Sequence, residues 1–411
     1  MPTFSKTVSW ADIFNILGLC PCFSTSEKSP IISKTYESKQ TKAHVLTLGV
    51  SCSCFSIRKG VWRYLRCGKD TEQFRPIFFA MKKLLSFFLV LVCAVSSFAQ
   101  TSLMATLNHE GSISTFYGTV ALRQAHAAAA SGDVITLSSG TFLSTDISKA
   151  VTIRGAGMYV TKAYDIVSEP TVLSGDFRIK IPAEDTGRLT LEGIYHNETI
   201  MFYEGQTKNA LFLKSRFKDI SRTGDCKVQD LTVLNCRIAG RIDLYDGNSA
   251  QFLNSVIDGF YRGYFSFNHC VIRDSYNELG RSGNEYKSSI ICCTNRYQNS
   301  FSSSSSAYNN LFISDETKIL SNVPNNTNLR VPTSDERFAY LRGYDDSKDY
   351  KLTDQNRDVL KATDGGEIGI YGGSLPYSAI PTNPQITKFN VASKTTADGK
   401  LSVDIEVKSG E

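Results

Sequence analysis

Residues 211–219 read LFLKSRFKD, residues 232–240 read TVLNCRIAG, and residues 251–259 read QFLNSVIDG. In each segment a serine or cysteine stands at the fifth position, with a leucine two places before it and a large apolar residue two places after it. Because side chains alternate along a β-strand, residues two places apart lie on the same face. The pattern therefore predicts short strands that turn a leucine, a small side chain and a large apolar side chain inward together.

The same alignment extends over seven segments, whose small or polar anchors lie 15 to 22 residues apart. The anchors are Gly193, Ser215, Cys236, Ser255, Cys270, Ser289 and Asn310. The residue directly before the anchor is polar each time, so we expect it to face outward. The interval of 15 residues between Ser255 and Cys270 indicates either a tight circuit or a local misalignment. One inward strand in each circuit of about twenty residues is typical of a parallel β-solenoid.

Two other folds, the β-sandwich and the leucine-rich repeat, fit this pattern less well. A β-sandwich places antiparallel strands every 8–12 residues and does not require the same residue class at the same phase. A leucine-rich repeat has a similar period but a fixed Leu/Asn consensus, which these segments lack. The sequence thus favours an all-β solenoid over both.

Residues 119–130 (TVALRQAHAAAA) are rich in alanine and predict a helix, with Gly132 as its stop signal. Residues 134–137 (VITL) then predict a strand, followed by a turn at Ser139 and Gly140. A helix placed before the first rung would cover strand edges that otherwise invite aggregation.

The run from Leu122 to Phe142 resembles the N-terminal cap and first rung of pectin-lyase-like right-handed parallel β-helix proteins. Residues 364–373 (DGGEIGIYGG) resemble the closing segment of many secreted bacterial members. The resemblance covers residues 115–376 and implies a right-handed parallel β-helix with an N-terminal capping helix. It does not imply one activity, because the superfamily includes polysaccharide lyases, glycoside hydrolases and adhesins.

Residues 81–99 (MKKLLSFFLVLVCAVSSFA) have the three parts of a bacterial secretory signal: two lysines, a twelve-residue largely apolar run, and small residues before a cleavage point after Ala99. The apolar run is too short to span a bilayer comfortably. We therefore expect an exported protein without a transmembrane span, located outside the cell, on its surface or in the periplasm. Residues 1–80 are interpreted as translated leader, although a cysteine-rich head that binds metal is the alternative.

Charge and cysteine content change once residues 1–99 are set aside. They hold 13 of the 45 basic and 5 of the 40 acidic residues, which leaves 32 basic and 35 acidic residues and a formal net charge of −3. This balance gives no support to a nucleic-acid partner. Five scattered cysteines remain, an odd number that does not indicate a disulfide framework. Cys236 and Cys270 are expected to be buried thiols, and the adjacent Cys292 and Cys293 are expected to point to opposite faces of a strand.

We assign residues 100–376 to the β-helix and residues 377–411 to a linker and a short β appendage. The appendage contains two alternating segments, 386–391 (ITKFNV) and 401–407 (LSVDIEV). Some thirty residues cannot bury a core of their own. They therefore form either a two-stranded ribbon packed on the solenoid or a truncated sandwich module.

The resemblance implies where lyase chemistry would lie, because lyases of this superfamily use a basic residue or tyrosine on the outer face of one sheet. The repeat places Arg216 and Arg237 one position after the anchor, and Lys218 and Arg273 three positions after it. Lys218, Arg237 and Arg273 are thus the candidate catalytic residues. The simpler interpretation is that exposed strand positions are basic or polar. The other residues one position after the anchor are aliphatic, which indicates partial cover by a loop or by the C-terminal segment.

A calcium site is a further hypothesis, since residues 345–349 (DDSKD) place oxygen-bearing side chains at alternate positions. The loop lacks the glycine at position six and the acid at position twelve of a calcium-binding loop. We therefore assign no cofactor and no metal ligand, with calcium kept as an option.

The sequence predicts an exported or cell-surface β-helix protein that interacts with a polysaccharide, with uronate-polysaccharide lyase activity as an option. The alternative is a non-catalytic structural or adhesive surface protein. A phase-matched cluster of a base and carboxylate-neutralising groups on one sheet favours the first, and outward columns of aliphatic or Asn/Ser residues without a groove favour the second.

Overall fold

The computed structural model describes residues 57–58, 61–62, 103–163, 166–273, 283–293, 304–323, 327–396 and 398–408. The chain divides into two units, Met1–Val92 and Cys93–Glu411. In the first unit, the described residues form β1 (Ile57–Arg58) and β2 (Val61–Trp62), which pair antiparallel. The expected export signal at residues 81–99 and nearly all of the expected leader lie outside the described residues.

The second unit contains two long sheets, and the first of them, sheet 1, has eleven strands. Its strands in chain order are β3 (Met104–His109), β4 (Ser112–Tyr117), β5 (Val134–Leu137), β7 (Thr152–Arg154), β12 (Thr190–Glu192), β15 (Leu211–Leu213), β18 (Leu231–Leu234), β20 (Ser249–Leu253), β22 (Tyr264–Asn268), β24 (Glu285–Lys287) and β26 (Ser306–Tyr308). From β5 onward each strand pairs parallel with the next in this list. Strand β3 pairs antiparallel with both β4 and β5.

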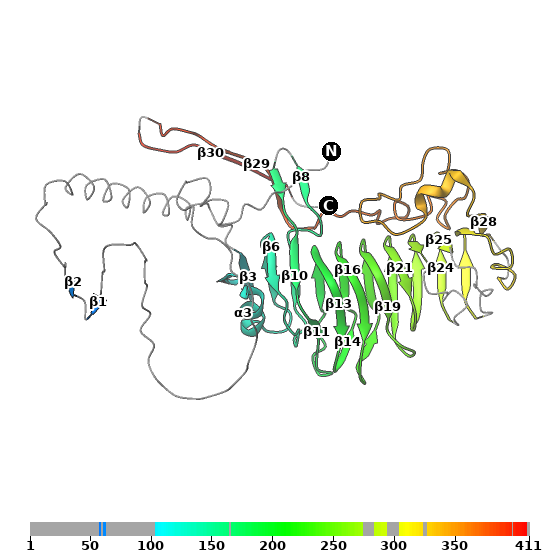
Figure 1. The fold of residues 1–411 in the computed structure, drawn as a ribbon, viewed down its shortest axis with the longest axis horizontal. Coiled ribbons are helices and arrows are strands. Elements are labelled where there is room, and N and C mark those ends of the chain that lie inside the picture. The colour runs from blue at the N-terminus through cyan, green and yellow to red at the C-terminus, as the bar shows by residue number, and fades with distance from the viewer. Residues whose placement is uncertain are drawn as a thin grey trace, which may run out of the picture. The chain divides into compact units, whose positions relative to one another are not determined.

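Sheet 2 also has eleven strands, and every pairing within it is parallel. Its strands are β6 (Gly140–Leu143), β10 (Thr171–Ser174), β11 (Phe177–Ile179), β13 (Ile194–Phe202), β16 (Arg216–Arg222), β19 (Arg237–Asp243), β21 (Val256–Phe260), β23 (Val271–Arg273), β25 (Ile290–Cys293), β27 (Leu311–Ser314) and β28 (Leu329–Val331). Through the main run of circuits the chain alternates between the two sheets, so it coils into a parallel β-solenoid of about 8 turns. Figure 1 shows the strands side by side along the axis, from cyan at β3 to yellow at β28.

A one-residue corner between the sheets explains the repeat in the sequence. In the rung around Ser215, β15 ends at Leu213 and β16 begins at Arg216. The residue directly before the anchor has a φ between 45° and 54° in six consecutive rungs, in the left-handed region that L-residues seldom adopt. This conformation turns the chain from one sheet into the other. Asparagine occupies three of these six positions, which fits its tolerance of positive φ.

The corner corrects one predicted orientation. The pattern predicts that the leucines two places before the anchor point inward, which holds for Leu191 but is wrong for Leu213, Leu234 and Leu253. Phe212, three places before Ser215, is fully buried in the core, whereas Leu213 is half-buried on the outer face. The positive-φ residue interrupts the strand alternation on which the prediction relied. The large apolar residue two places after the anchor does point inward, as Phe217 shows.

The strand register tests the alignment itself. Val256 pairs with Val271, which confirms the tight interval of 15 residues between their anchors. The first anchor is wrong by one residue. Leu213 pairs with Glu192 and Arg216 pairs with Tyr195, so the equivalent of Ser215 is Ile194 and not Gly193.

The small polar anchors form a hydrogen-bonded ladder inside the solenoid. The backbone N–H of Cys236 donates to Ser255 Oγ over 3.1 Å, and the N–H of Cys270 donates to Ser289 Oγ over 3.0 Å. These side chains satisfy buried amides at the corner, where strand pairing lapses. The ladder continues through Asn310, whose Oδ1 accepts the N–H of Ser289 over 2.9 Å, to Asn328, whose Oδ1 accepts the N–H of Asn310 over 2.9 Å.

The cysteines behave as the sequence indicates. All five cysteines that the structure describes are buried thiols. Burial raises the pKa of the Cys236 and Cys270 thiols to about 12. Cys293 belongs to the inner core, and its neighbour Cys292 belongs to the apolar layer on the outer side of sheet 2, which confirms their predicted opposite orientations.

Residues 329–383, which we call the covering segment, lie over part of the outer surface of the solenoid. The aliphatic residues one position after the anchor, such as Val271 and Ile290, pack beneath Phe338, Leu341 and Ile368, which confirms the predicted cover. Phe338 and Leu341 come from the 3₁₀ helix η1 (Glu336–Leu341).

Further along, residues 361–383 pass over the corner residues of successive rungs. Asn254 Nδ2 donates to the carbonyls of Ile370 and Gly372 over 2.9 and 2.8 Å, and the carboxylate of Glu192 accepts the N–H of Thr382 over 2.6 Å. The polar corner residues therefore point away from the core, as predicted, but are buried by this segment.

The ends of the second unit carry smaller elements. Helix α3 (Ala121–Ala128) buries Leu122 and Ala125 against β3–β6. Two short ribbons, β8 (Thr161–Ala163) with β9 (Ile166–Ser168) and β29 (Gln385–Val391) with β30 (Val403–Lys408), are antiparallel. Within the described residues, no helix is both long and apolar enough to cross a membrane.

Candidate functional site

Arg237, the first of the candidate catalytic residues, is buried beneath the covering segment and is only 4% exposed. Its guanidinium donates to the Tyr377 hydroxyl over 3.0 Å and to the backbone carbonyls of Asp345, Asp346 and Lys348. Burial alone would lower the pKa of Arg237, but the tyrosines around it, Tyr377 first, raise it. The guanidinium is thus a charged anchor for the loop above it, and it does not face an open groove.

Arg216 has a similar position one rung earlier. Its Nε and Nη2 donate to Asp346 Oδ2 over 3.2 and 3.0 Å, and its guanidinium lies 4.8 Å from the centre of the Tyr195 ring. The hydroxyls of Tyr159 and Tyr344 donate to the other carboxylate oxygen of Asp346. Burial would raise the pKa of Asp346, but the hydrogen bonds from Tyr344 and Arg216 hold it below its ordinary value. This network fastens residues 344–346 to sheet 2.

The other two candidates do not join Arg237 on one surface. Lys218 is exposed and lines a shallow hollow of about 430 Å³ with Asp176, Arg178 and Glu198. Arg273 lies three rungs further along the solenoid and forms an ion pair with Asp258, with 2.6 Å between Nε and Oδ1. The structure therefore separates Lys218, Arg237 and Arg273 into an open, a covered and an ion-paired position.

The acidic loop at residues 345–349 holds its carboxylates against protein donors. Asp345 Oδ1 accepts the N–H and the hydroxyl of Ser347 over 2.8 and 2.7 Å, and Asp346 accepts from Arg216, Tyr159 and Tyr344. Across the described ranges, no group of three or more His, Cys, Asp or Glu side chains is placed to hold a metal ion. The carboxylates of Asp345 and Asp346 therefore accept hydrogen bonds from protein groups.

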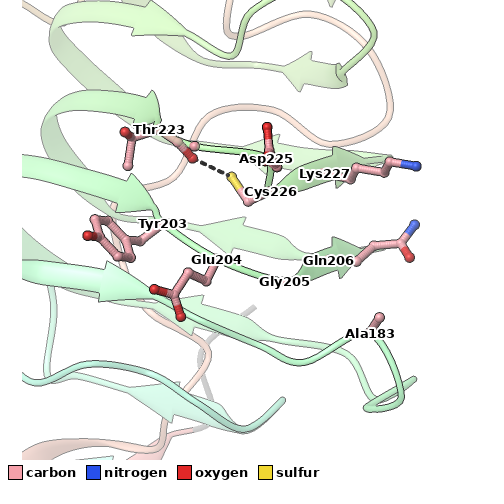
Figure 2. A pocket seen from close by; sticks show the side chains of 10 residues that line it. Ala183, Tyr203, Glu204, Gly205, Gln206, Thr223, Asp225, Cys226 and Lys227 are labelled. Atoms are coloured by element: carbon pink, nitrogen blue, oxygen red, sulfur yellow. Dashed lines mark hydrogen bonds between the residues drawn. The ribbon is translucent and has the colours of Figure 1, made fainter.

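An open pocket lies elsewhere, at the far end of strands β13 and β16. Its volume is about 570 Å³, and we call it the turn pocket. Two successive turns form its walls, residues 203–206 after β13 and residues 223–227 after β16 (Figure 2). The side chains that line it with polar groups are Tyr203, Glu204, Gln206, Thr223, Asp225 and Lys227.

Local sequence explains why a hollow forms there. β13 and β16 run past the bulge that follows His196. After each of them the chain turns into a short strand, β14 (Gln206–Lys208) or β17 (Lys227–Gln229), and these two strands pair in a third, two-stranded sheet. Gly205, with a φ of 77°, passes so close to the backbone of Ile181 that a Cβ would lie 1.8 Å from its carbonyl oxygen. Only glycine fits this turn. Gly224, with a φ of 63°, serves the next turn.

Tyr203 gives the pocket an aromatic wall, with 37% of its surface exposed. Lys180 and Arg178 lie on the preceding rung, with the Lys180 ammonium 4.9 Å and the Arg178 guanidinium 5.6 Å from the ring centre. The lining residues 223–227 come from the following rung. A hydrogen bond to Asp146 is the largest cause that raises the pKa of Lys180. The ring is therefore held in place by neighbouring cations while part of it stays open.

The chemistry of the turn pocket is that of hydrogen bonding. Figure 2 shows the carboxylates of Glu204 and Asp225 pointing away from one another, so they do not form a pair around one bond. Cys226 is buried, its thiol donates to the carbonyls of Phe202 and Thr223, and burial raises its pKa. The pocket thus offers donors, acceptors and a ring, and no activated nucleophile.

Aromatic and basic side chains continue along the same edge of sheet 2. The Arg262 guanidinium lies 3.4 Å from the centre of the Tyr245 ring and 4.9 Å from that of Tyr261. Arg262 also donates two hydrogen bonds to the buried carboxylate of Asp243, over 3.0 and 2.7 Å. Tyr245 is 38% exposed. Rigid tyrosine faces therefore follow the turn pocket on later rungs.

The repeat of the anchors does not predict the turn pocket. A signal was present, because residues 203–208 (YEGQTK) and 223–229 (TGDCKVQ) both place an acid beside a glycine at the same distance after an inward strand. The repeated anchors lie at the corner at the other end of the strands, so their spacing gives no information about this second turn.

Comparison of the chain with protein-family models, with curated protein sequences and with solved structures finds no match.

Proposed function

We propose that this protein is an exported β-solenoid that binds a polysaccharide in the turn pocket. The observation that carries the proposal is the exposed Tyr203 ring in a wall of a 570 Å³ hollow whose other polar groups are Glu204, Gln206, Thr223, Asp225 and Lys227. Pockets of about 300–1,000 Å³ with a few convergent polar groups are the usual size of small-ligand sites. One or two sugar units fit that description.

A sugar ring suits these groups for a physical reason. One face of a pyranose is lined by C–H bonds and stacks on an aromatic ring, while its hydroxyls need both donors and acceptors. Tyr203 supplies the ring, Glu204 and Asp225 accept, Lys227 donates, and Gln206 does both. Tyr245 and Tyr261 on later rungs would extend the contact to a polymer.

Binding is favoured over cleavage by the positions of the charged residues. A lyase site needs a base and charge-neutralising groups around one substrate position. Arg237 is buried in contacts with the covering segment, and Arg273 is ion-paired with Asp258, three rungs from Lys218. The carboxylates of Glu204 and Asp225 diverge. The function therefore does not require catalysis, and no metal or cofactor is assigned to it.

The proposal includes a place in the right-handed, pectin-lyase-like group of β-helices and a capping role for α3. The parallel two-sheet coil and the resemblance at residues 122–142 and 364–373 support the first. The packing of Leu122 and Ala125 against β3–β6 supports the second. Export rests on the signal at residues 81–99.

The test compares Tyr203→Ala with Tyr308→Ala, because Tyr308 on β26 is exposed to the same degree, 38% against 37%. Each variant and the unaltered protein are screened against neutral and acidic bacterial and plant polysaccharides by affinity electrophoresis. We expect one class of polymer to retard the unaltered protein and Tyr308→Ala, and Tyr203→Ala to lose at least roughly tenfold in affinity, the cost of an aromatic stacking contact.

Two results would contradict this function. Equal retardation of all three proteins would place binding outside the turn pocket. No retardation by any polymer would favour the structural or adhesive alternative. Absorbance of the unsaturated uronate product, followed in the same incubations, separates a lyase from a binding protein, and we expect no increase.

A further inference from the structure

Strand β4 (Ser112–Tyr117, SISTFY) forms an unguarded edge of sheet 1. Among the described strands it pairs only with β3, and it ends the strand order of that sheet. Natural proteins protect edge strands with lysine, proline, a bulge or a covering segment. β4 contains no charge and no proline, and its pairing with β3 runs without a register shift. An exposed edge of this kind is a template for another strand.

The turn before β4 determines which backbone groups are unpaired. Glu110 and Gly111 both have positive φ, 49° and 87°, as in the two-residue turn that closes a tight hairpin. The flanking pair, His109 and Ser112, then exchanges hydrogen bonds, and every second residue of β4 does the same. The hydrogen bond from Gly118 N–H to the Leu103 carbonyl, over 2.8 Å, continues this alternation. The amides and carbonyls of Ile113, Thr115 and Tyr117 therefore point away from β3, toward the open edge.

Side-chain exposure marks the same residues. Ile113 is 71% exposed and Tyr117 is 62% exposed, the two largest values among the exposed large apolar residues that the structure describes. Thr115 lies between them and is also exposed. The three side chains share one face because they alternate with Ser114 and Phe116. Phe116 instead packs against the core.

The opposite end of the solenoid is closed in a way that β4 is not. Beyond β26, the N–H of Asn309 donates to Thr327 Oγ1 over 3.0 Å, and the N–H of Asn310 donates to Asn328 Oδ1 over 2.9 Å. Ile319 and Val323 cover the inner core at that end. Of the two described ends of sheet 1, the one at β4 combines an uncovered strand edge with exposed apolar side chains.

We propose that β4 pairs antiparallel with β4 of a second copy of this chain, around a two-fold axis at Thr115. The unpaired residues are self-complementary in this register. Thr115 lies opposite the partner's Thr115, and Ile113 lies opposite the partner's Tyr117, twice in the dimer. A β-branched residue across from an aromatic residue is a stabilising cross-strand pair. Because the strand is uncharged, no like charges meet.

The dimer joins the first sheets of both copies into one continuous sheet. Three unpaired residues on each copy become hydrogen-bonded, and four exposed apolar side chains are partly buried. An interface built on one strand pair is smaller than the area of about 1,200–2,000 Å² that stable complexes bury, so we expect association in the micromolar range. It would also place two turn pockets on one particle, which strengthens binding to a long polymer.

A charge exchange at the axis tests the proposal. Thr115→Lys and Thr115→Asp each place two like charges opposite one another, while an equimolar mixture of the two variants places opposite charges there. In sedimentation equilibrium, we expect the unaltered protein to dimerise, each variant alone to show a dissociation constant roughly tenfold or more higher, and the mixture to regain association. Ile405→Lys on β30 is the control, because Ile405 is another exposed apolar residue, at 52%.

A cysteine at the axis tests the register. Opposed residues of a hydrogen-bonded antiparallel pair have Cα atoms about 5.5 Å apart, within disulfide reach. Thr115→Cys should therefore form a covalent dimer under mild oxidation, and Ser114→Cys, whose side chain lies on the other face, should form it much more slowly. A monomeric unaltered protein, a mixture that does not regain association, or loss of the dimer in Ile405→Lys alone would each overturn the proposal.

Discussion

Two basic residues on neighbouring strands of sheet 2 have opposite surroundings. Arg237 on β19 is 4% exposed and contacts the covering segment through four hydrogen bonds. Lys218 on β16 is exposed beside an open hollow. Both were equal candidates in the repeat, because both point outward from the strand. The difference arises from residues 345–377, which lie more than a hundred positions later in the chain.

The comparison shows that direction and accessibility are separate properties in a solenoid. The local pattern determines whether a side chain points into the coil. A remote segment then decides whether an outward side chain meets solvent or protein. One part of sheet 2 is consequently a second apolar layer beneath η1, and another part is the wall of the turn pocket.

The largest expected effect comes from Arg237→Met. The substitution leaves the carbonyls of Asp345, Asp346 and Lys348 without their donor in a buried site, and it removes a cation from between three tyrosine rings. We expect the free energy of unfolding to fall by about 4 kcal/mol. Urea unfolding followed by circular dichroism measures the change.

Lys218→Met is the matched control for Arg237→Met, since it removes an exposed charge from the neighbouring strand. Its effect on the free energy of unfolding should stay within about 0.5 kcal/mol. If Arg237→Met is as stable as the unaltered protein, the covering segment is not anchored there. The comparison between a covered and an open face of sheet 2 would then fail.

A second contrast concerns two histidines near the N-terminal end of the solenoid. His126 on α3 is 5% exposed, and burial followed by the charge of Lys149 lowers its pKa to about 4. His109 on β3 is half-exposed, and its hydrogen bond to Asp133 raises its pKa. The pKa of the histidine is therefore lowered in the covered position and raised in the open position.

The signs of the two pH effects follow from the unfolded state, where histidine has a pKa of about 6.5. Between that value and about 4, the unfolded chain binds a proton at residue 126 and the folded chain does not. Folding stability should therefore fall as the pH is lowered through this range, by up to about 3 kcal/mol. His109 acts in reverse. Its contribution is complete below the unfolded pKa and is lost as the pH rises through the raised folded pKa.

Urea unfolding of His126→Gln and His109→Gln at several pH values separates these contributions. Relative to the unaltered protein, His126→Gln should lose less stability between pH 6.5 and pH 4, and His109→Gln should lose less above pH 6.5. If His126→Gln retains the full acid sensitivity, other groups cause the loss, and the buried position of His126 has no part in it.

How far the fold follows from the sequence depends on which interactions are local. The alternation of strand residues and the repeated anchor were sufficient to predict a parallel solenoid and the inward position of Phe217 and Ile238. The positive φ at Lys214 was not visible in the pattern, because lysine gives no sign of that conformation. The predicted inward orientation of Leu213 was wrong for this reason.

The candidate site was harder to predict, because it depends on contacts between distant segments. The sequence indicated that a loop or the C-terminal segment would cover part of sheet 2, but it did not show that Arg237 would be among the covered residues. It also gave no measure of how the carboxylates of Glu204 and Asp225 are directed. Spacing along the chain restricts which rungs are neighbours, and it does not restrict which turns leave a hollow between them.

The smallest of these expected effects concerns two serines, one inside the corner and one outside the coil. Ser255 Oγ accepts the N–H of Cys236 over 3.1 Å and donates to the Leu253 carbonyl over 2.8 Å, and it is fully buried. Ser255→Ala leaves that amide without an acceptor, so we expect a loss of about 2 kcal/mol in the free energy of unfolding. Ser266 on the outer face of β22 donates to Glu285 Oε2 over 3.0 Å, where water can replace it, and Ser266→Ala should cost less than about 0.5 kcal/mol.

Ser255→Cys sharpens the test of the ladder. Cysteine already occupies the same position in the rungs before and after, and a hydrogen bond from the backbone of Ser215 acts on the Cys236 thiol. A thiol at residue 255 can thus accept from the Cys236 amide, although more weakly than a hydroxyl. The loss of stability should lie between zero and that of Ser255→Ala. Equal losses for the cysteine and alanine variants would mean that the column needs only a small side chain, and that the amide at the corner is satisfied without it.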